Sequence, residues 1–164
     1  MKRPVFFAAL AGLAFVPFAA QADELPKRKP GLWETQMSGM AGAPAMTVKQ
    51  CIDANTDQLA QSAVQPGATC SKREIKKVAA GYEMESNCTI SGITAVGKGL
   101  VTGDFVSKVT VDMTTTMSGI PGQAQPVTTK MTIASTRGGD CAAGQSPGDI
   151  IMPNGQIVKT PGTK

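Results

Sequence analysis

The residues whose chemistry is easiest to assign are four cysteines, Cys51, Cys70, Cys88 and Cys141. They are widely spaced and contain no C-x-x-C pair, whereas a zinc site made of four cysteines normally has two close pairs. An even number of such cysteines predicts two disulfides in an oxidising compartment. Three pairings are open, and spacing alone does not choose among them. We favour Cys51–Cys70 with Cys88–Cys141; a rival pairing joins Cys70 to Cys88 across a hairpin.

Catalysis is disfavoured by what the sequence lacks. It contains no histidine, which removes the Ser-His-Asp triad, the Cys-His pair and every histidine ligand to zinc or haem. Residues 144–148 match the G-x-S-x-G pattern, but Pro147 has no N–H to stabilise an oxyanion, so we interpret them as a loop. Glu83 and Glu85 share one strand face, where we expect them to be solvated rather than an acid–base pair. We therefore predict a protein that is not an enzyme, with no catalytic residue and no cofactor.

Methionines are the other residues with possible ligand chemistry. Met37, Met40 and Met46 cluster around a loop of small residues, and Met113 and Met117 share one strand face. Thioether clusters can bind Cu(I), but methionine is also a common filler of cores that are poor in aromatic residues. We expect no metal site, and we rank a copper carrier, together with a hydrolase, as the least favoured function.

Basic residues gather in two runs, 27–29 and 72–77. Such runs can contact anionic lipid headgroups or acidic glycans, although most are simply solvated faces. Nucleic acid is not an expected partner, because the formal net charge is only +4 and aromatic residues, which stack on bases, make up 4% of the chain.

The first 22 residues have the pattern of a cleavable secretory signal peptide. Residues 1–3 carry the positive charge, residues 4–20 form an apolar run, and Ala20-Gln21-Ala22 supplies the cleavage site. The apolar run is short for a membrane span, and no later segment is apolar enough to cross a bilayer. The sequence therefore predicts export, with no transmembrane segment after cleavage.

Hydrophobic periodicity predicts antiparallel β-structure over residues 31–141. The strongest stretch is 108–117, where apolar and polar side chains alternate and β-branched residues dominate. Similar patterns predict six other strands: 31–37, 46–52, 71–78, 82–90, 97–102 and 127–136. The one expected helix covers Asp53–Ser62, with Asp53 or Asn55 as its N-cap.

Other segments flank or interrupt this β-domain. Alternation breaks between Ile75 and Val78, so we expect a bulge or twist there. Residues 23–30 are charged and contain two prolines, which indicates a solvated leader. Residues 142–164 are a Gly/Pro-rich tail that is either loose or forms a small hairpin over Asp149–Lys159.

These patterns together predict an all-β fold: an antiparallel, up-and-down curved sheet or half-open barrel of about seven strands with one short helix. We expect the inner face of this sheet to have an apolar lining made of eight side chains: Trp33, Val48, Tyr82, Met84, Val109, Val111, Met113 and Ile133. If the curled sheet leaves a cavity between these side chains, a lipid or another hydrophobic molecule fits it.

The order of several short motifs resembles a known family. Residues 29–34 (KPGLWE) open the domain, Gly103-Asp104-Phe105 marks a turn in a glycine-rich strand pair, and Gly139-Asp140-Cys141 closes it. This order resembles the domain-of-unknown-function family 3617 of exported bacterial proteins. The resemblance implies a periplasmic, disulfide-bearing β-domain and supplies no functional residues. Gly31-x-Trp33 is also similar to the first-strand motif of lipocalin-like barrels.

The favoured function is a non-catalytic module of the cell envelope that binds a lipid or another apolar small molecule. The alternative is a structural or protein-interaction module of the envelope without a small ligand, which the missing catalytic residues and the Gly/Pro-rich tail also suit. The sequence does not predict the oligomeric state.

Overall fold

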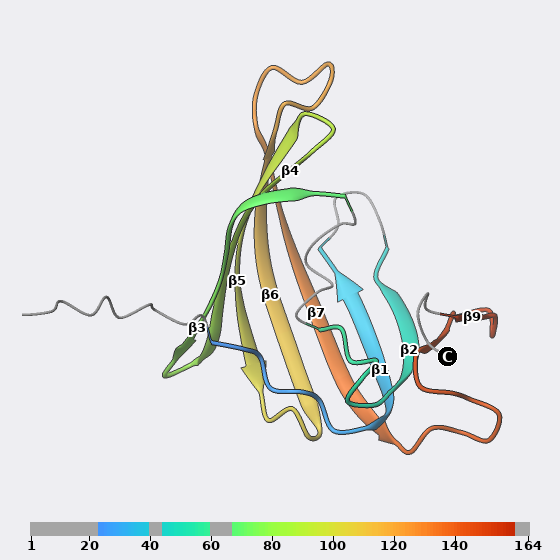
Figure 1. The fold of residues 1–164 in the computed structure, drawn as a ribbon. Helices are drawn as coiled ribbons and strands as arrows, with labels where there is room; N and C mark the ends of the chain where they lie inside the picture. Colours follow the sequence, from blue (N-terminus) through green and yellow to red (C-terminus); the bar gives the residue numbers. More distant parts are fainter. Residues whose placement is uncertain (1–22, 40–43, 60–66, 160–164) are drawn as a thin grey trace, which may run out of the picture.

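The computed structural model describes residues 23–39, 44–59 and 67–159, and in this part the chain forms one antiparallel sheet (Figure 1). The sheet has nine strands: β1 (Gly31–Ser38), β2 (Met46–Ile52), β3 (Thr69–Val78), β4 (Gly81–Ile90), β5 (Ile93–Gly103), β6 (Lys108–Ser118), β7 (Val127–Gly139), β8 (Asp149–Ile151) and β9 (Ile157–Lys159). Their order across the sheet is β3-β4-β5-β6-β7-β1-β2-β8-β9, so β3 and β9 are the edges and the sheet is not closed into a barrel. The all-β antiparallel architecture predicted from the sequence is confirmed, with nine strands in place of about seven.

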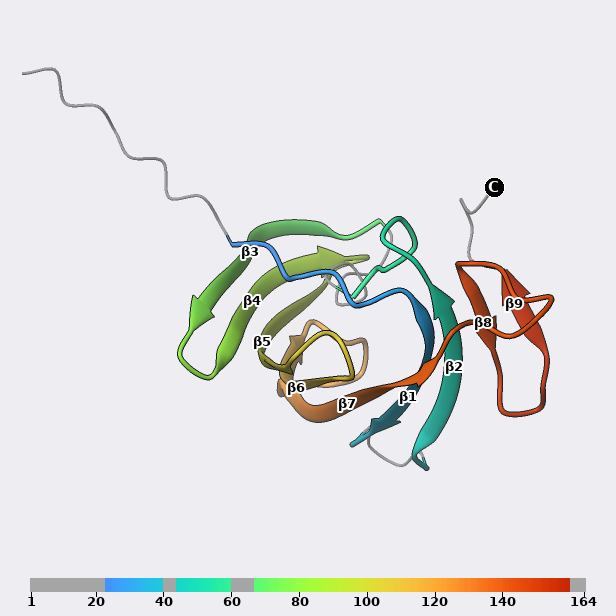
Figure 2. The ribbon, with the colours of Figure 1, turned by 90° about the horizontal axis from the view of Figure 1, so that it is seen from below.

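The sheet curls around a concave side, and residues 23–30 cross its open side between β3 and β1 (Figure 2). Two glycines of β5 help to make this curvature possible. A Cβ atom at Gly97 would lie 2.8 Å from Ser86 Oγ, and one at Gly99 would lie 3.1 Å from the carbonyl oxygen of Asp112. A side chain at Gly97 would displace the Ser86 hydroxyl, and one at Gly99 would press on the backbone of β6, so glycine suits the close approach of strands in the bent sheet.

A hydrophobic core fills one end of the curled sheet, where β1 begins and β5 turns into β6. It consists of seven buried side chains: Leu25, Trp33, Ile52, Val101, Phe105, Val109 and Val111. The indole N–H of Trp33 donates a hydrogen bond to the carbonyl oxygen of Lys29 at 2.9 Å, which satisfies the polar atom of this buried side chain. The rings of Tyr82 and Phe105 meet edge to face with their centroids 5.9 Å apart. The scarce aromatic residues are thus concentrated in this end of the domain.

The charged leader lies against the sheet. Six of its eight residues are exposed, as expected from its composition, and two are buried. Leu25 and Arg28 are buried. The backbone N–H of Asp23 donates to the carbonyl oxygen of Ile75 at 3.0 Å, and the Asp23 carboxylate accepts a bond from the backbone N–H of Lys77 at 2.8 Å. The leader is therefore attached to the outer edge of β3 before it crosses to β1.

Residues 53–59 form turns instead of the predicted helix. Asp53 Oδ1 accepts bonds from the backbone N–H groups of Asn55 and Thr56, both at 2.9 Å, so the expected cap closes a turn. Asp57 Oδ1 then accepts bonds from Arg28 Nε and Nη2 at 3.0 and 2.8 Å. This long-range contact competes with a continuing helix. The last three residues of the predicted helix lie outside the described residues. In the part of the chain that the structure describes, no helix is long and apolar enough to span a membrane.

The register shift in β3 lies between Cys70 and Lys72, not near Ile75 and Val78 as predicted. Side chains on a strand alternate, so residues 70 and 75 would normally face opposite sides of the sheet. One extra residue at Ser71 reverses the parity, as β-bulges do. Both Cys70 and Ile75 thereby pair with inward-facing residues of β4.

The chain after residue 141 ends in a hairpin that joins the sheet. Strands β8 and β9 pair with each other, and β8 also pairs with β2. Lys159 Nζ donates to both carboxylate oxygens of the buried Asp149, at 2.6 and 2.8 Å. The hairpin interpretation of Asp149–Lys159 is thus correct, and the loose-tail interpretation is wrong for this stretch.

Candidate binding site: an apolar cavity in the curled sheet

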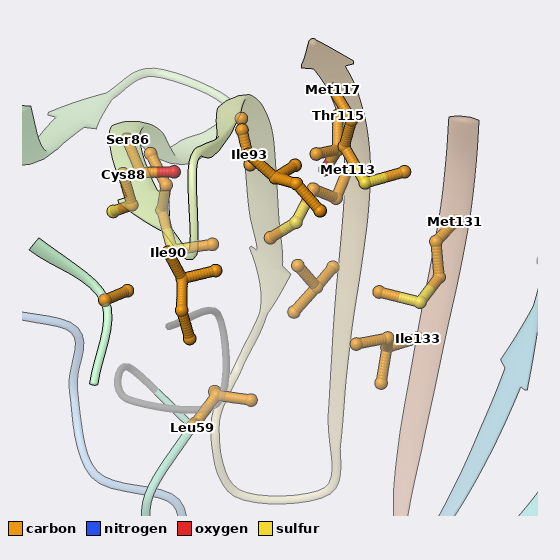
Figure 3. Close-up of a pocket in the computed structure, with 15 residues that line it drawn as sticks. Leu59, Ser86, Cys88, Ile90, Ile93, Met113, Thr115, Met117, Met131 and Ile133 are labelled. Carbon is orange, nitrogen blue, oxygen red and sulfur yellow. The ribbon is translucent and has the colours of Figure 1, made fainter. Parts of the chain in front are cut away.

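A cavity of about 370 Å³ occupies the concave side of the sheet, beyond the hydrophobic core (Figure 3). This volume lies within the range of roughly 300–1,000 Å³ that is typical of small-molecule sites. The larger lining side chains are methionines and branched aliphatic residues: Leu59, Met84, Ile90, Ile93, Val111, Met113, Met117, Met131 and Ile133. Among the described residues that line it, none has a charged side chain. The cavity is therefore suited to apolar parts of a ligand.

The cavity exists because β5 contributes little side-chain volume to the middle of the concave face. Ala95 and Gly97 of β5 line the cavity, and Gly99 comes next on the same face. The neighbouring strands carry long side chains in the same rows, since Gly99 pairs with both Met84 and Met113. Large residues therefore surround a floor of small ones, which leaves a hollow between them.

Four methionines, Met84, Met113, Met117 and Met131, give the cavity an adaptable wall. Met113 and Met131 are direct cross-strand partners on β6 and β7, and Figure 3 shows both side chains directed into the hollow. Methionine is unbranched and polarisable, so such a wall reshapes around ligands of different outline.

Two hydroxyl groups are the polar features of this cavity. Ser86 of β4 and Thr115 of β6 both pair with Gly97 from opposite sides. A Cβ atom at Gly97 would lie 2.8 Å from Ser86 Oγ and 3.9 Å from Thr115 Oγ1, so both hydroxyls border the same gap. They provide a neutral polar anchor in otherwise apolar surroundings.

The predicted apolar lining divides into three groups. Met84, Val111, Met113 and Ile133 line the cavity. Three others, Trp33, Tyr82 and Val109, belong to the core or pack against it, and Val48 lines a neighbouring cavity. The sequence prediction left out Met117 and Met131, although the same alternation along β6 and β7 places them on this face. The part played by Ala95 and Gly97 was missed, because their contribution is the volume that they leave empty.

A second cavity of about 290 Å³ lies beside the first. The two share Leu59 and Ile133 in their linings. The second is more polar, with the side chains of Arg28, Thr35, Gln50, Gln58 and Ser135 in its wall. The hydroxyl oxygens of Thr35 and Ser135 are 2.9 Å apart and hydrogen-bonded.

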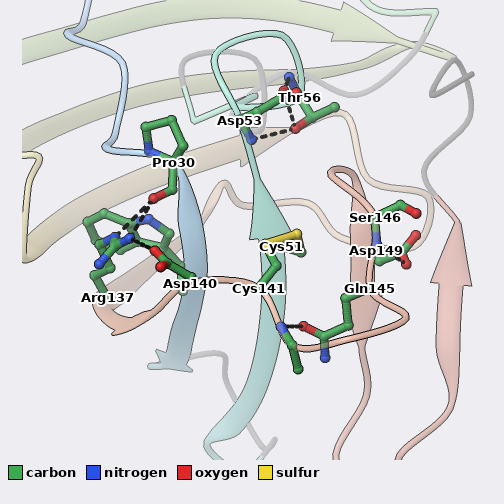
Figure 4. The surroundings of a disulfide bond; sticks show 12 residues. Pro30, Cys51, Asp53, Thr56, Arg137, Asp140, Cys141, Gln145, Ser146 and Asp149 are labelled. Atoms are coloured by element: carbon green, nitrogen blue, oxygen red, sulfur yellow. Dashed lines mark hydrogen bonds and ion pairs between the residues drawn. A yellow bond between two sulfur atoms is a disulfide. The ribbon is translucent and has the colours of Figure 1, made fainter.

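One disulfide joins Cys51 to Cys141 (Figure 4). The other joins Cys70 to Cys88, so the sequential pairing favoured from the sequence is wrong. Cys70 and Cys88 are opposite each other on β3 and β4, as in the rival hairpin pairing. Cys51 of β2 and Cys141 after β7 join the chain on either side of β1, which lies between β2 and β7. The sequential pairing would need β2 beside β3, and these strands are not neighbours in the sheet.

The residues considered for catalysis lie away from these two cavities. Glu83 and Glu85 instead line a more open hollow of about 400 Å³, together with Lys98 and Asp112. Glu83 and Glu85 are on the convex face, and Lys72 and Lys98 form ion pairs with Glu85. A hydrogen bond from Lys72, followed by one from Lys98, lowers the pKa of the Glu85 carboxyl. Both carboxylates thus lie on the predicted solvated face.

The remaining motifs also have structural explanations. Ser146 of the G-x-S-x-G match lies in the loop before β8, and its backbone N–H donates to Asp149 Oδ2 at 2.9 Å. Met37 lines the second cavity, and Met46 is its cross-strand partner on β2, while Met40 lies outside the described residues. Among the described residues no group of three or more His, Cys, Asp or Glu side chains is placed to hold a metal ion.

The fold and the cavities define a disulfide-linked, open antiparallel β-sheet protein with an apolar interior. Residues 28–141 match the family model described as "Protein of unknown function (DUF3617)", and the chain therefore belongs to this family. No curated protein and no solved structure matches the chain significantly. The family resemblance found in the sequence is confirmed, whereas the likeness to lipocalin-like barrels has no support. The two disulfides are consistent with an oxidising, exported location; the predicted signal peptide lies outside the described residues.

Proposed function

We propose that this protein is a non-catalytic binding module of the cell envelope, exported to the periplasm, whose methionine-lined cavity holds a small hydrophobic ligand. The observation that carries the proposal is the cavity of about 370 Å³ with an apolar, uncharged lining. When a ligand excludes water from this apolar surface, binding is favoured by roughly 25 cal/mol per Å² of area removed from water.

The chemistry of the lining supports binding without catalysis. Its polar groups are the hydroxyls of Ser86 and Thr115, and its one cysteine, Cys88, is held in a disulfide. A cavity lined in this way offers no general base and no free thiolate to a bound molecule. It offers dispersion contacts, two neutral hydrogen-bonding groups and an adaptable methionine wall.

A direct test measures binding of a neutral apolar fluorophore, N-phenyl-1-naphthylamine, to the exported protein. Ala95→Leu places a larger side chain on the cavity floor, where it competes with the ligand for space. Because overpacking is unfavourable by about 1–3 kcal/mol, binding should weaken about ten-fold. Val96→Leu is the matched control, because Val96 is the next residue on β5 and is exposed on the convex face. It should bind the fluorophore like the wild-type protein.

Native mass spectrometry of the protein, purified without detergent, provides an independent measurement. A reproducible lipid-sized adduct that is lost in Ala95→Leu supports the proposal. A bare mass together with unmeasurable fluorophore binding would overturn it and favour the alternative, an envelope interaction module with no small ligand. Circular dichroism of both variants checks that each has folded.

A further inference from the structure

The two cavities together point to one amphipathic ligand, and this inference rests on the proposed function. We propose that the ligand is an acyl or alkyl chain with an uncharged hydrogen-bonding head, such as an ester, amide or alcohol. The chain occupies the methionine-lined cavity. The head occupies the second cavity, beside Gln50 and Gln58.

The shared wall makes a single ligand possible. Leu59 and Ile133 line both cavities, so the two hollows meet at these side chains. Leu59 comes from the 53–59 turn segment and Ile133 from β7, so two separate elements form the boundary. A chain that passes this boundary extends from an apolar space of about 370 Å³ into a more polar space of about 290 Å³.

The polar side chains of the second cavity set the chemistry of the head. Gln50 and Gln58 each present an amide, which donates and accepts hydrogen bonds. Among the described residues, neither amide side chain hydrogen-bonds to another protein group. Thr35 and Ser135 bond to each other and retain capacity for one more partner each. A head with both a carbonyl and a hydroxyl or N–H matches this set.

The charge balance argues against an ionic head. Of the described residues that line the second cavity, only Arg28 has a charged side chain. Its charge is matched by Asp57, whose two carboxylate oxygens accept three bonds from Arg28. A ligand carboxylate or phosphate would compete with Asp57 and be repelled by it, and a ligand ammonium would be repelled by Arg28. An uncharged head has neither penalty.

The test compares ligands that share one chain and differ only in the head. Dodecane, dodecanoate, dodecylamine and monododecanoylglycerol are each titrated against the fluorophore bound to the exported protein. The monoacylglycerol should bind at least about five-fold more tightly than the other three, which corresponds to one net hydrogen bond. Gln50→Leu and Gln58→Leu should each reduce this preference and leave dodecane binding unchanged.

Gln36→Leu is the matched control, since Gln36 is exposed on the convex side of β1. It should preserve the preference for the monoacylglycerol. Equal affinity for all four ligands, tighter binding of either ionic one, or an unchanged preference in both glutamine variants would overturn this inference and leave the proposed function intact. Failure of all four ligands and of the fluorophore to bind would overturn both.

Discussion

Arg28 and Asp57 form a buried ion pair between the leader and the turn segment on the open side of the sheet, with side chains only 4% and 1% exposed. Besides the guanidinium, the backbone N–H of Arg28 also donates to Asp57, at 2.7 Å. The guanidinium carbon lies 5.2 Å from the centroid of the Trp33 ring, so a cation–π contact links the pair to the core. One ion pair thus joins three separate segments of the chain.

The first prediction concerns the loss of one partner from this pair. Asp57→Asn leaves the Arg28 charge buried without its counter-charge, which should lower the free energy of unfolding by about 3–5 kcal/mol. Urea denaturation of the exported, oxidised protein measures the change. A double replacement, Arg28→Met with Asp57→Leu, should recover part of the loss because neither charge is then buried.

An exposed ion pair provides the control for this measurement. Lys49 and Glu34 on the convex face are 3.4 Å apart, and both side chains are more than half exposed. Glu34→Gln should change stability by no more than about 1 kcal/mol. If Asp57→Asn is no more destabilising than Glu34→Gln, the structural importance assigned to the buried pair is wrong.

The second prediction separates the two disulfides. Cys51–Cys141 spans 90 positions and Cys70–Cys88 spans 18. Loop-closure entropy then gives about 4.5 kcal/mol of stabilisation for the first and about 3 kcal/mol for the second. Replacing each pair by alanine should therefore destabilise the protein more at 51 and 141, as measured by thermal or urea unfolding.

Ligand binding should respond to the disulfides in the opposite order. Cys88 lines the methionine-lined cavity, whereas neither Cys51 nor Cys141 does. Loss of the 70–88 disulfide should alter fluorophore affinity while the protein remains folded. A peptide map under non-reducing conditions that links residue 51 to residue 70 would contradict both assignments.

The third prediction concerns oxidation of the cavity wall. Peroxide converts methionine to its sulfoxide, which is polar and no longer suits an apolar lining. Oxidation of Met84, Met113, Met117 and Met131 should weaken fluorophore binding about ten-fold, in line with the free energy of burying an unpaired polar group.

The control for oxidation replaces these four methionines by leucine, a change that nearly conserves volume. This variant should bind the fluorophore and be insensitive to peroxide. Enzymatic reduction of the sulfoxides should restore binding to the oxidised wild-type protein. Unaltered binding after complete oxidation would show that the methionines do not contact the ligand.

The fourth prediction is a pH dependence of the C-terminal hairpin. The Lys159 ammonium, and after it the backbone N–H of Ser146, lower the pKa of Asp149 below its ordinary value of 3.8. A carboxyl whose pKa is lowered by folding stabilises the fold above the unfolded pKa and loses that contribution as the pH falls through the folded pKa. The hairpin should therefore be fully formed at neutral pH and loosen only below about pH 4.

Nuclear Overhauser contacts between Ile150 and Val158, which are cross-strand partners, report on the hairpin as the pH is lowered. Asp149→Asn should weaken these contacts at neutral pH and remove their dependence on pH in the acid range. Retention of full contacts in the variant at every pH would show that the ion pair does not hold the hairpin.

Local patterns in the sequence predicted the strands well. The expected bounds of β2 match the structure, and β6 coincides with the strongest alternation. Successive side chains on a strand face opposite sides, so a strand with one buried face shows alternating apolar and polar residues. This alternation is visible without knowing which strands lie beside it. The same alternation predicted the apolar lining, and half of the predicted residues, including Met84 and Met113, line the cavity.

Features that depend on strand order or distant contacts were not accessible in this way. The disulfide pairing requires knowing that β1 lies between β2 and β7. The predicted helix after β2 had a good cap in Asp53. However, Asp57 accepts hydrogen bonds from Arg28, which lies 29 positions earlier in the chain. The polar lining of the second cavity, with Gln50 and Gln58, was missed because Gln50 resembles a residue of a solvated face and Gln58 lies in the segment predicted to be a helix.

The attachment of Asp23 to β3 has a consequence for behaviour at high protein concentration. An edge strand with free N–H and C=O groups is a template for pairing with another molecule. Asp23 occupies the carbonyl group of Ile75 and the N–H group of Lys77, while β8 covers the outer side of β2. Part of each margin of the long strands is thereby shielded from the intermolecular strand addition that leads to aggregation, and the short strand β9 remains as an edge.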